Sequence, residues 1–214
     1  MASWTKEKNF PIINIERKTN EIIVKQSLFR FDHNVSSKDV KWIVPLKFNT
    51  SNGNTTDYIL KDFQGTIQFD SSNIDWIKFN PQQFGYYIVN YTESDWKSLT
   101  HALVSNFEQF SPSDRSNLLF DAFLLAEANQ LNYSIAFDLL LYVKNENHFI
   151  PWTTASTILT QLNSLLSTST QSLFISELIK SLSEKAYRTI GWEYIGRSEE
   201  SLLNKSVYLI YSSV

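Results

Sequence analysis

The stretch Phe84–Trp96 reads FGYYIVNYTESDW and joins two kinds of secondary structure. Its first half is rich in aromatic and β-branched residues, which predicts a strand over residues 84–91. Both faces of that strand are largely apolar, so we expect it to be covered on two sides. Thr92 or Ser94 then predicts the N-cap of a helix, with acidic residues near its positive end. The chain therefore changes from strands to helices at this point.

Upstream of this stretch, short runs of strand-forming residues alternate with turn signals. These runs are PIINIERK, EIIVKQSLFRF, VKWIVPLKFNT, Asp57–Leu60, GTIQFD and DWIKFN. Thr19-Asn20 separates the first two runs, and SNGNTT, whose Asn-Gly pair suits a positive φ, follows the third. Pro45 inside the third run predicts an edge strand or a bulge. Turns every 8–12 residues or so are typical of a sandwich, so we expect about seven strands in two layers.

Downstream, the apolar period becomes helical. Trp96, Leu99, Leu103 and Phe107 recur at helical spacing in the first helix. Further helices are predicted over about Ser111–Asn129, Ser134–Lys144, Pro151 onward, Gln171–Thr189 and Glu199 to the end. Short connections favour antiparallel helix hairpins that stack into an α-solenoid-like array.

The second helix carries clear terminal signals. Ser111 is the predicted N-cap, Pro112 occupies the first helical position and Asp114 lies at N3. The helix should end near Asn129, because Asn adopts the left-handed conformation more easily than other chiral residues.

The predicted fold class is α+β in separate domains. Residues 10–92 form a β-sandwich, and residues 93–214 begin an all-α domain of helical hairpins, with the boundary near Tyr91–Ser94. The final segment SLLNKSVYLIYSSV stops on apolar residues, so we expect the helical domain to be truncated.

Composition excludes several classes of protein. The 214 residues carry a net charge of -3, which gives no basic footprint for nucleic acid. No apolar run of about 18 residues is present, and the first ten residues have no apolar signal core. The chain has no Cys, which removes disulfides, thiolate nucleophiles and Cys-based zinc sites.

Six N-x-S/T triplets are candidate glycosylation sites, against roughly three or four expected by chance from this composition. They begin at Asn34, Asn49, Asn54, Asn90, Asn132 and Asn204. They favour an extracellular or secretory-pathway protein, with a cytoplasmic location as the alternative.

The residue inventory predicts no catalytic and no metal-binding site. His33, His101 and His148 stand apart, and no H-E-x-x-H, H-x-H, G-x-G-x-x-G or G-x-S-x-G motif is present. His101 is expected to be solvated or to act as a cap on its helix, and His148 is expected to lie in a loop.

Three charged residues near the second helix look structural rather than catalytic. Asp114 is expected to serve the helix N-terminus, and Arg115 is expected to pair locally or with a neighbouring helix. Asp121 lies among apolar residues, so it should accept a hydrogen bond from a backbone group or an Arg across the hairpin. The tryptophans are spread over many elements, which favours a role in the core.

In this order, the segments WTKEKNFP, WIKFNPQQFGYYIVNYTESDW, FSPSDRSNLLFDAFLLAEANQLNY and PW before a helix resemble the gluzincin aminopeptidases. These are relatives of aminopeptidase N and puromycin-sensitive aminopeptidase. The motif residues carrying the resemblance, read as structural, are Trp4, Gly85, Tyr86, Tyr87, Asn90, Tyr91, Trp96, Pro112, Asp114, Arg115, Asp121, Pro151 and Trp152.

The resemblance implies a place within a larger zinc-dependent enzyme that removes N-terminal residues from peptides. Residues 1–9 would be the tail of a missing catalytic domain that holds the zinc. The sandwich would act as a spacer, and the helices would begin a lid over the active site. Expected partners are that catalytic domain, further C-terminal helices and peptide substrates. The alternative is a stand-alone binding or adhesion module without enzymatic activity.

Four positions depart from the family pattern. Ile88 stands where the family usually has Arg, and Thr92 where it has Asp, so polar contacts made by those two are lost. Asn9 and Asn129 replace Gly, and we expect both to keep a left-handed backbone.

Overall fold

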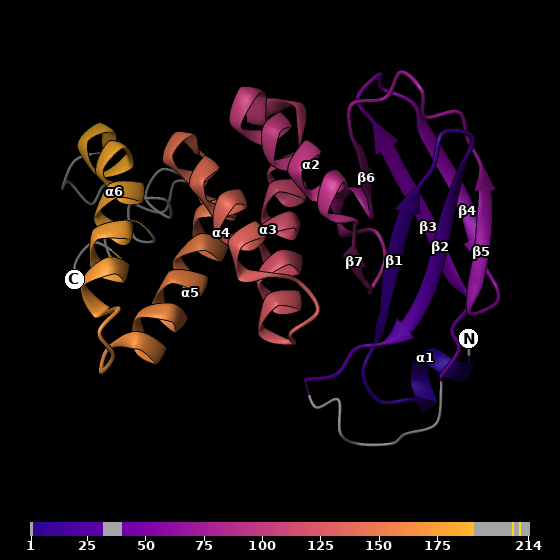
Figure 1. Ribbon diagram of the computed structural model, residues 1–214, viewed down its shortest axis with the longest axis horizontal. Coiled ribbons are helices and arrows are strands. Elements are labelled where there is room, and N and C mark those ends of the chain that lie inside the picture. The colour runs from indigo at the N-terminus through magenta and orange to yellow at the C-terminus, as the bar shows by residue number, and fades with distance from the viewer. Residues whose placement is uncertain (1, 32–39, 191–206, 208–209, 211–214) are drawn as a thin grey trace.

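The computed structural model describes residues 2–31, 40–190, 207 and 210. Within these residues a short helix α1 (Ala2–Lys6) precedes seven strands, and five longer helices follow (Figure 1). The α+β class is thereby confirmed. None of the helices in the described part of the chain is both long and apolar enough to cross a bilayer.

The strands form two sheets. They are β1 (Pro11–Arg17), β2 (Glu21–Leu28), β3 (Val44–Thr50), β4 (Thr55–Leu60), β5 (Gln64–Gln68), β6 (Ile77–Phe79) and β7 (Ile88–Asn90). One sheet has the order β5-β2-β1-β7 and the other β4-β3-β6. Every pairing is antiparallel except that of β1 with β7, which is parallel.

The turn chemistry explains the two hairpins. Thr19-Asn20 links β1 to β2, with Pro11 opposite Leu28 at the far end. The Asn-Gly pair links β3 to β4, and Gly53 has the predicted positive φ of 83°. Pro45 lies in the middle strand of its sheet, but β6 pairs only with the last three residues of β3. Among the described residues, no strand pairs with that side of β3 at Pro45, which suits a residue that has no N–H to donate.

The strand predicted over residues 84–91 is wrong in its first half. Only β7 is a strand, because the backbone before it bonds to a side chain instead of a neighbouring strand. The amide of Asn80 donates to the carbonyls of Gly85 and Tyr87, and its oxygen accepts from the Gly85 N–H at 2.8 Å. The short 3-10 helix η1 (Pro81–Gln83) brings this loop back toward Asn80.

The helices follow one another away from the sheets (Figure 1). They are α2 (Glu93–Asn106), η2 (Phe107–Gln109), α3 (Pro112–Glu127), α4 (Tyr133–Leu140), η3 (Leu141–Asn145), α5 (Phe149–Leu166) and α6 (Ser172–Ile190). Helix α3 contacts both α4 and α5, and α5 contacts α6. The predicted helix from Glu199 onward falls outside the described residues, apart from Val207 and Ile210.

The helix caps match the local sequence signals. Thr92 accepts from the Asp95 N–H and Ser111 from the Asp114 N–H, with Pro112 at the start of α3. Asn129 ends α3 with a φ of 55°, and Asn9 has a φ of 69°, as expected where Asn replaces Gly. His148 lies in the loop before α5, as predicted, and its Nδ1 also accepts from the Ile150 N–H and caps that helix.

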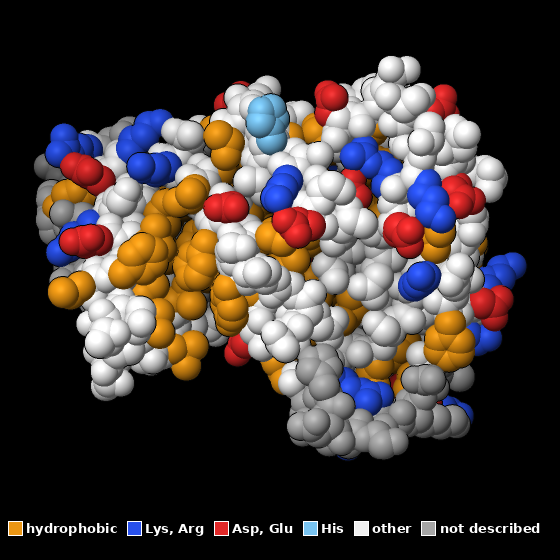
Figure 2. All heavy atoms as spheres, in the orientation of Figure 1, with side chains coloured by type: hydrophobic (Ala, Val, Ile, Leu, Met, Phe, Trp, Pro, Cys, Tyr) orange, Lys and Arg blue, Asp and Glu red, His pale blue; other side chains and the backbone are white. Residues whose placement is uncertain are grey.

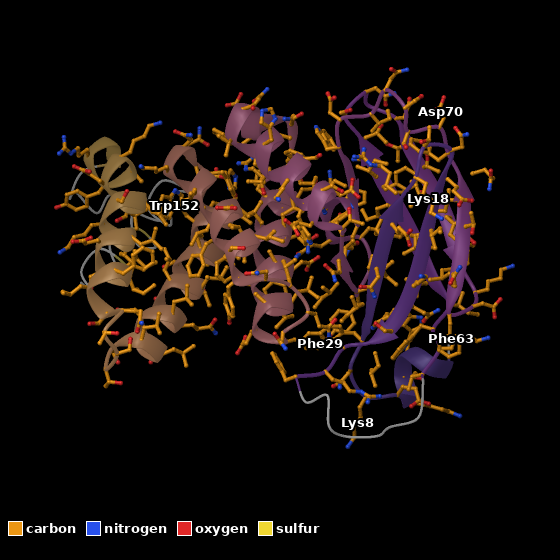
Figure 3. All side chains as sticks on the ribbon, viewed as in Figure 1. Lys8, Lys18, Phe29, Phe63, Asp70 and Trp152 are labelled. Atoms are coloured by element: carbon orange, nitrogen blue, oxygen red, sulfur yellow. The ribbon has the colours of Figure 1, made fainter. Side chains whose placement is uncertain are left out.

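A continuous apolar core runs from the sheets into the helices. Trp42, Trp96 and Trp152 are almost fully buried, and Trp152 lies inside the helical part in Figure 3. On the face drawn in Figure 2, apolar side chains gather over the helical end, whereas charges of both signs are scattered across the sheets. Trp42, Trp76, Trp96 and Trp152 are therefore core residues, as predicted, whereas Trp4 is half-buried and Trp192 lies outside the described residues.

Candidate functional site between the sheets and the helices

A cluster of buried polar side chains lies where β6, η1 and β7 meet the first turns of α3. The charged members are Lys78 on β6 and Asp114 and Asp121 on α3. Asn117, one turn from each aspartate, completes the helical set. Positions 114, 117 and 121 share one face of α3 because residues three and four apart are neighbours on a helix.

Lys78 is the central cation of this cluster, with only 2% of its side chain exposed. Its ammonium lies 2.8 Å from an Asp114 oxygen and donates to Asn117 Oδ1 at 2.9 Å and to the Asn80 carbonyl at 2.7 Å. An ammonium has three donors, so all of them are used. Burial lowers the pKa of Lys78, and the nearby Asp114 opposes that change.

Asp114 ties the helix to the loop that precedes β7. Its Oδ1 accepts from the Gln82 N–H at 2.7 Å, and its Oδ2 accepts from the Ser111 hydroxyl at 2.6 Å. Burial raises the pKa of Asp114, but the ammonium of Lys78 and the hydrogen bonds from Lys78, Ser111 and Gln82 outweigh it, so the pKa is lowered. Asp114 therefore contacts both the start of its own helix and the segment before β7.

Asp121 ties the same helix to β7. Its Oδ2 accepts from the Val89 N–H at 3.1 Å and its Oδ1 from the Asn117 amide at 3.0 Å. The prediction of a hydrogen bond from a backbone group is confirmed, but the donor is in a strand and not across the helix hairpin. Burial raises the pKa of Asp121 to about 7, opposed by the Val89 hydrogen bond, the charge of Lys78 and the Asn117 amide.

Asp121 gives the chain a specific pH dependence of stability. The carboxyl titrates near its ordinary value of 3.8 when unfolded but at about 7 when folded, so folding takes up a proton between those values. The stabilisation is complete below the unfolded pKa and is lost as the pH rises through the folded one. We expect the free energy of unfolding to fall between about pH 5 and about pH 8, and Asp121→Asn to reduce that fall.

Urea unfolding of the unmodified chain and of Asp121→Asn, each at about pH 5 and about pH 8, measures this fall in the free energy of unfolding. Asp114 acts in the opposite sense: its pKa is lowered, so the stability that it contributes is lost only as the pH falls below the ordinary pKa of an aspartate. An unchanged pH dependence in Asp121→Asn would assign the effect to other groups.

The loop before β7 depends on a glycine. A β-carbon at Gly85 would overlap the ring of Tyr87, which is buried against it. Gly85→Ala is therefore expected to displace that ring and lower the free energy of unfolding by about 1–3 kcal/mol. Chemical denaturation measures the loss. In a Tyr87→Leu background the same change should cost less, and an equal cost in both backgrounds would contradict the steric explanation.

Two further contacts join strands to α2. Arg17 on β1 forms an ion pair with Asp95 at 2.8 Å. The Trp96 indole donates to Asn90 Oδ1 at 3.2 Å, and the Asn90 amide donates to Asn14 at 3.2 Å. The first turn of α2 is thus tied to both β1 and β7.

A second buried ion pair lies within the helical part. Arg115 Nε and Nη2 donate to the two oxygens of Glu146 at 2.7 and 2.9 Å. Glu146 also accepts from the N–H groups of Asn147 and His148, and its carbonyl accepts from the Trp152 indole at 3.0 Å. The expectation that Arg115 pairs with a neighbouring helix is nearly right, since Glu146 lies in the turn before α5.

The motif residues fall into three groups. Gly85, Tyr87, Asp114 and Asp121 meet at the first cluster, and Arg115 meets Trp152 through Glu146. Asn90, Tyr91 and Trp96 form the strand-to-α2 contact, where the Tyr91 and Trp96 rings lie 5.0 Å apart. Trp4 stands apart, with its indole donating to the Ile43 carbonyl at 3.1 Å. Pro151 lies in the first turn of α5, and Tyr86 is exposed.

Lys78, Asn80, Asn117 and Glu146 were not predicted from the sequence. Lys78 could have been recognised as a site residue because it lies inside the apolar run DWIKFN. A strand buried on both faces offers no solvent to an ammonium group, which then needs buried partners. Asn117 could have been recognised by its helical spacing from Asp114 and Asp121, which places it on the same face of the helix. No comparable local signal marks Glu146.

The candidate glycosylation sites differ in accessibility. Asn54 and Asn132 are exposed, although Asn132 also caps α4. Asn49 and Asn90 are half-buried in strands, and the Asn90 amide nitrogen is already a hydrogen-bond donor. The other two, at positions 34 and 204, lie outside the described residues. Glycosylation itself stays a prediction.

The contacts of both clusters hold elements of the fold together. In the described residues, no group of three or more His, Cys, Asp and Glu side chains is placed to hold a metal ion. His101 is exposed on α2, and His148 is used as a cap. Within residues 2–31 and 40–190, the side chains are therefore not placed to hold a zinc ion.

A cavity of about 430 Å³ lies beside the first cluster. Asn117, Asp121 and Ile88 lie on its inner side. Exposed aromatic side chains of Phe84, Tyr86 and Phe120, and the half-buried ring of Phe10, form its outer walls.

Comparison with known proteins identifies the family. Residues 76–212 match the model of the ERAP1-like C-terminal domain. The chain is 30% identical over 217 aligned positions to glutamyl aminopeptidase of Sus scrofa, covering 97% of this chain and 23% of that protein. It is 31% identical over 207 positions to aminopeptidase N of Plutella xylostella, covering 90% and 21%.

A third relative, endoplasmic reticulum aminopeptidase 1 of Homo sapiens, is 33% identical over 152 positions, covering 71% of this chain and 16% of that protein. The chain thus spans less than a quarter of the length of these relatives. It belongs to the ERAP1-like C-terminal domain family and is related to the C-terminal part of aminopeptidases.

Proposed function

We propose that this chain is the non-catalytic C-terminal part of a zinc-dependent aminopeptidase. The observation that carries the proposal is the family match, which covers both the buried cluster and the helices. The reaction would be removal of N-terminal residues from peptides, with the zinc held by a catalytic domain outside these 214 residues. Residues 1–9 would be the tail of that domain.

In this proposal, residues 10–92 are a β-sandwich that acts as a spacer, and residues 93–214 begin an α-solenoid-like lid over the active site. Two buried ion pairs support these separate roles for the spacer and the lid. Lys78 and Asp114 tie the first long hairpin of helices to the sheets, and Arg115 and Glu146 tie α3 to the start of α5. A lid built this way moves together with its spacer.

The partners would be the catalytic domain, further helices and peptide substrates. We place the parent protein outside the cell or in the secretory pathway, as an ectodomain of a membrane-anchored enzyme. The exposed sequons at Asn54 and Asn132 are the sites that we expect to be glycosylated.

The activity is tested at two levels. The 214-residue chain with added zinc is expected to hydrolyse no aminoacyl reporter substrate. Protein captured from its source by an antibody against the chain should hydrolyse the reporter, lose activity to a chelator and regain it with zinc. It should run several times larger than 24.9 kDa and shift on deglycosylation. A single unshifted band near 24.9 kDa without activity would support a stand-alone module instead.

The lid role is tested by loosening the strand-to-α2 contact in the whole enzyme. Arg17→Gln removes an ion pair between β1 and α2 without touching the core cluster. We expect a lower kcat/KM for peptides and little change for a single-residue reporter, because a small substrate needs less of the closed cavity. Arg188→Gln, at an exposed pair on α6, is the control. Equal losses on both substrates would contradict a lid role.

A further inference from the structure

The cavity beside Asp121 combines an unbalanced buried charge with aromatic walls. The first cluster holds two carboxylates, Asp114 and Asp121, but one cation, Lys78. The three donors of Lys78 go to Asp114, Asn117 and the Asn80 carbonyl, so none reaches Asp121. The two donors to Asp121, the Val89 N–H and the Asn117 amide, are neutral.

Asp121 therefore retains acceptor capacity. An ionised carboxylate has about four lone-pair sites, and hydrogen bonds from these described partners use two. Its side chain is 2% exposed to solvent yet borders the cavity. A cation entering the cavity would meet a carboxylate that water does not solvate well, where charge-assisted hydrogen bonds are strong.

The outer walls suit an apolar body that carries such a cation. Phe84, Tyr86 and Phe120 are 61%, 72% and 48% exposed, which is unusual for large aromatic side chains. The Tyr86 ring packs edge-on against Phe10 at 5.4 Å, so the wall is partly ordered. Lys47 Nζ lies 5.4 Å from the Phe84 ring centroid, so one ring of this wall already contacts a cation of the chain itself.

We propose that this cavity is a binding site for a small organic cation with an aromatic or apolar body, such as an arylalkyl ammonium. The ammonium would lie beside Asp121 and Asn117, and the ring would lie between Phe84, Tyr86 and Phe120. The volume of about 430 Å³ is within the range of small-molecule pockets. The site lies between strands and α3, and it is separate from the peptide hydrolysis proposed above.

Calorimetry with the 214-residue chain at about pH 8 tests the charge requirement directly. The probe is 2-phenylethylamine and its neutral isostere is 2-phenylethanol. We expect the amine to bind at least ten-fold more tightly. Equal binding of both, or no binding of the amine, would overturn the proposal.

Variants locate the site. Asp121→Asn keeps an acceptor for the Val89 N–H and should weaken amine binding at least ten-fold, whereas Glu127→Gln, exposed on the same helix, removes the same charge and should not. Phe120→Ala should weaken both ligands. If Asp121→Asn fails to fold, the comparison of the amine with the alcohol on the unmodified chain still tests whether binding requires the positive charge. Full binding by a folded Asp121→Asn would exclude this cavity.

The pH dependence gives a second readout. The charged or titratable groups around Asp121 are Lys78 from β6, Asp114 from α3, and Tyr87 and Tyr91 beside β7. Lys47 from β3 lies farther out, against the Phe84 wall of the cavity. Burial raises the pKa of Asp121 to about 7 and also raises the pKa of both tyrosines, whereas burial lowers the pKa of Lys78 and Asp114 opposes that change. Amine affinity should rise as Asp121 ionises and then level off. An affinity that does not change with pH would contradict a contact with this carboxyl.

A tethered cation offers an independent test. Ile88, the first residue of β7, borders the cavity, so Ile88→Arg would place a guanidinium inside it. We expect a higher midpoint of unfolding at about pH 8 than for the neutral control Ile88→Met, together with loss of amine binding. An arginine variant that is no more stable than the methionine variant, or still binds the amine, would contradict the assignment.

Discussion

Lys78→Met is expected to lower the free energy of unfolding by about 3–5 kcal/mol, the cost typical of breaking a buried ion pair from one side. Methionine fills a similar volume, so little of the loss would come from a cavity. The loss arises because Asp114 keeps its buried charge without the ammonium and Asn117 and the Asn80 carbonyl lose a donor. Urea unfolding followed by tryptophan fluorescence measures the change.

Lys97→Met is the matched control, because Lys97 forms its pair with Glu93 in full contact with solvent. Exposed pairs contribute little to stability, so this variant should unfold almost like the unmodified chain. Similar losses in the two variants would mean that burial of the Lys78 pair does not determine its contribution. Replacing Asp114 by Asn in the Lys78→Met background should recover part of the loss.

Arg115→Met is expected to have an effect of the same order, about 3–5 kcal/mol, in the helical part. The Glu146 side chain is fully buried and would be left with its backbone donors alone. The Phe110 carbonyl would lose its donor as well. Thermal and chemical unfolding give the magnitude.

The control for Arg115 is Arg188→Met, at an exposed pair with Glu184 on α6. The double variant Arg115→Met/Glu146→Leu should be more stable than Arg115→Met alone, because it removes the unpaired charge too. If the double variant loses as much as the two single variants added together, the pair does not act as a unit.

Local signals in the sequence predicted local features of the fold. Thr92 and Ser111 lie at helix N-termini, where each side chain accepts from a backbone N–H three residues away. Asn129 ends α3 by adopting a positive φ. The turns at Thr19-Asn20 and Asn52-Gly53 were likewise predicted from local residues. Such contacts depend on neighbours in the chain, so a short window of residues contains the necessary information.

Contacts between distant segments were not predictable in the same way. Lys78 meets Asn117 at a separation of 39 residues, and Arg115 meets Glu146 at 31. Nothing near Glu146 in the chain indicates an arginine. The false strand over Phe84–Tyr87 has the same origin, since its composition is that of a strand but the Asn80 side chain binds its backbone.

The parallel pairing of β1 with β7 has a consequence for how the chain folds. Asn14 and Asn90, which meet across this pair, are 76 residues apart, and β1 lies between its hairpin partner β2 and this distant strand. Closing so long a loop costs entropy before any contact compensates for it, which slows folding. Because α3 binds the Val89 N–H, it can dock in its final place only after β7 has been added. The rate-limiting step should therefore be this closure, with the helices assembling on a completed sheet.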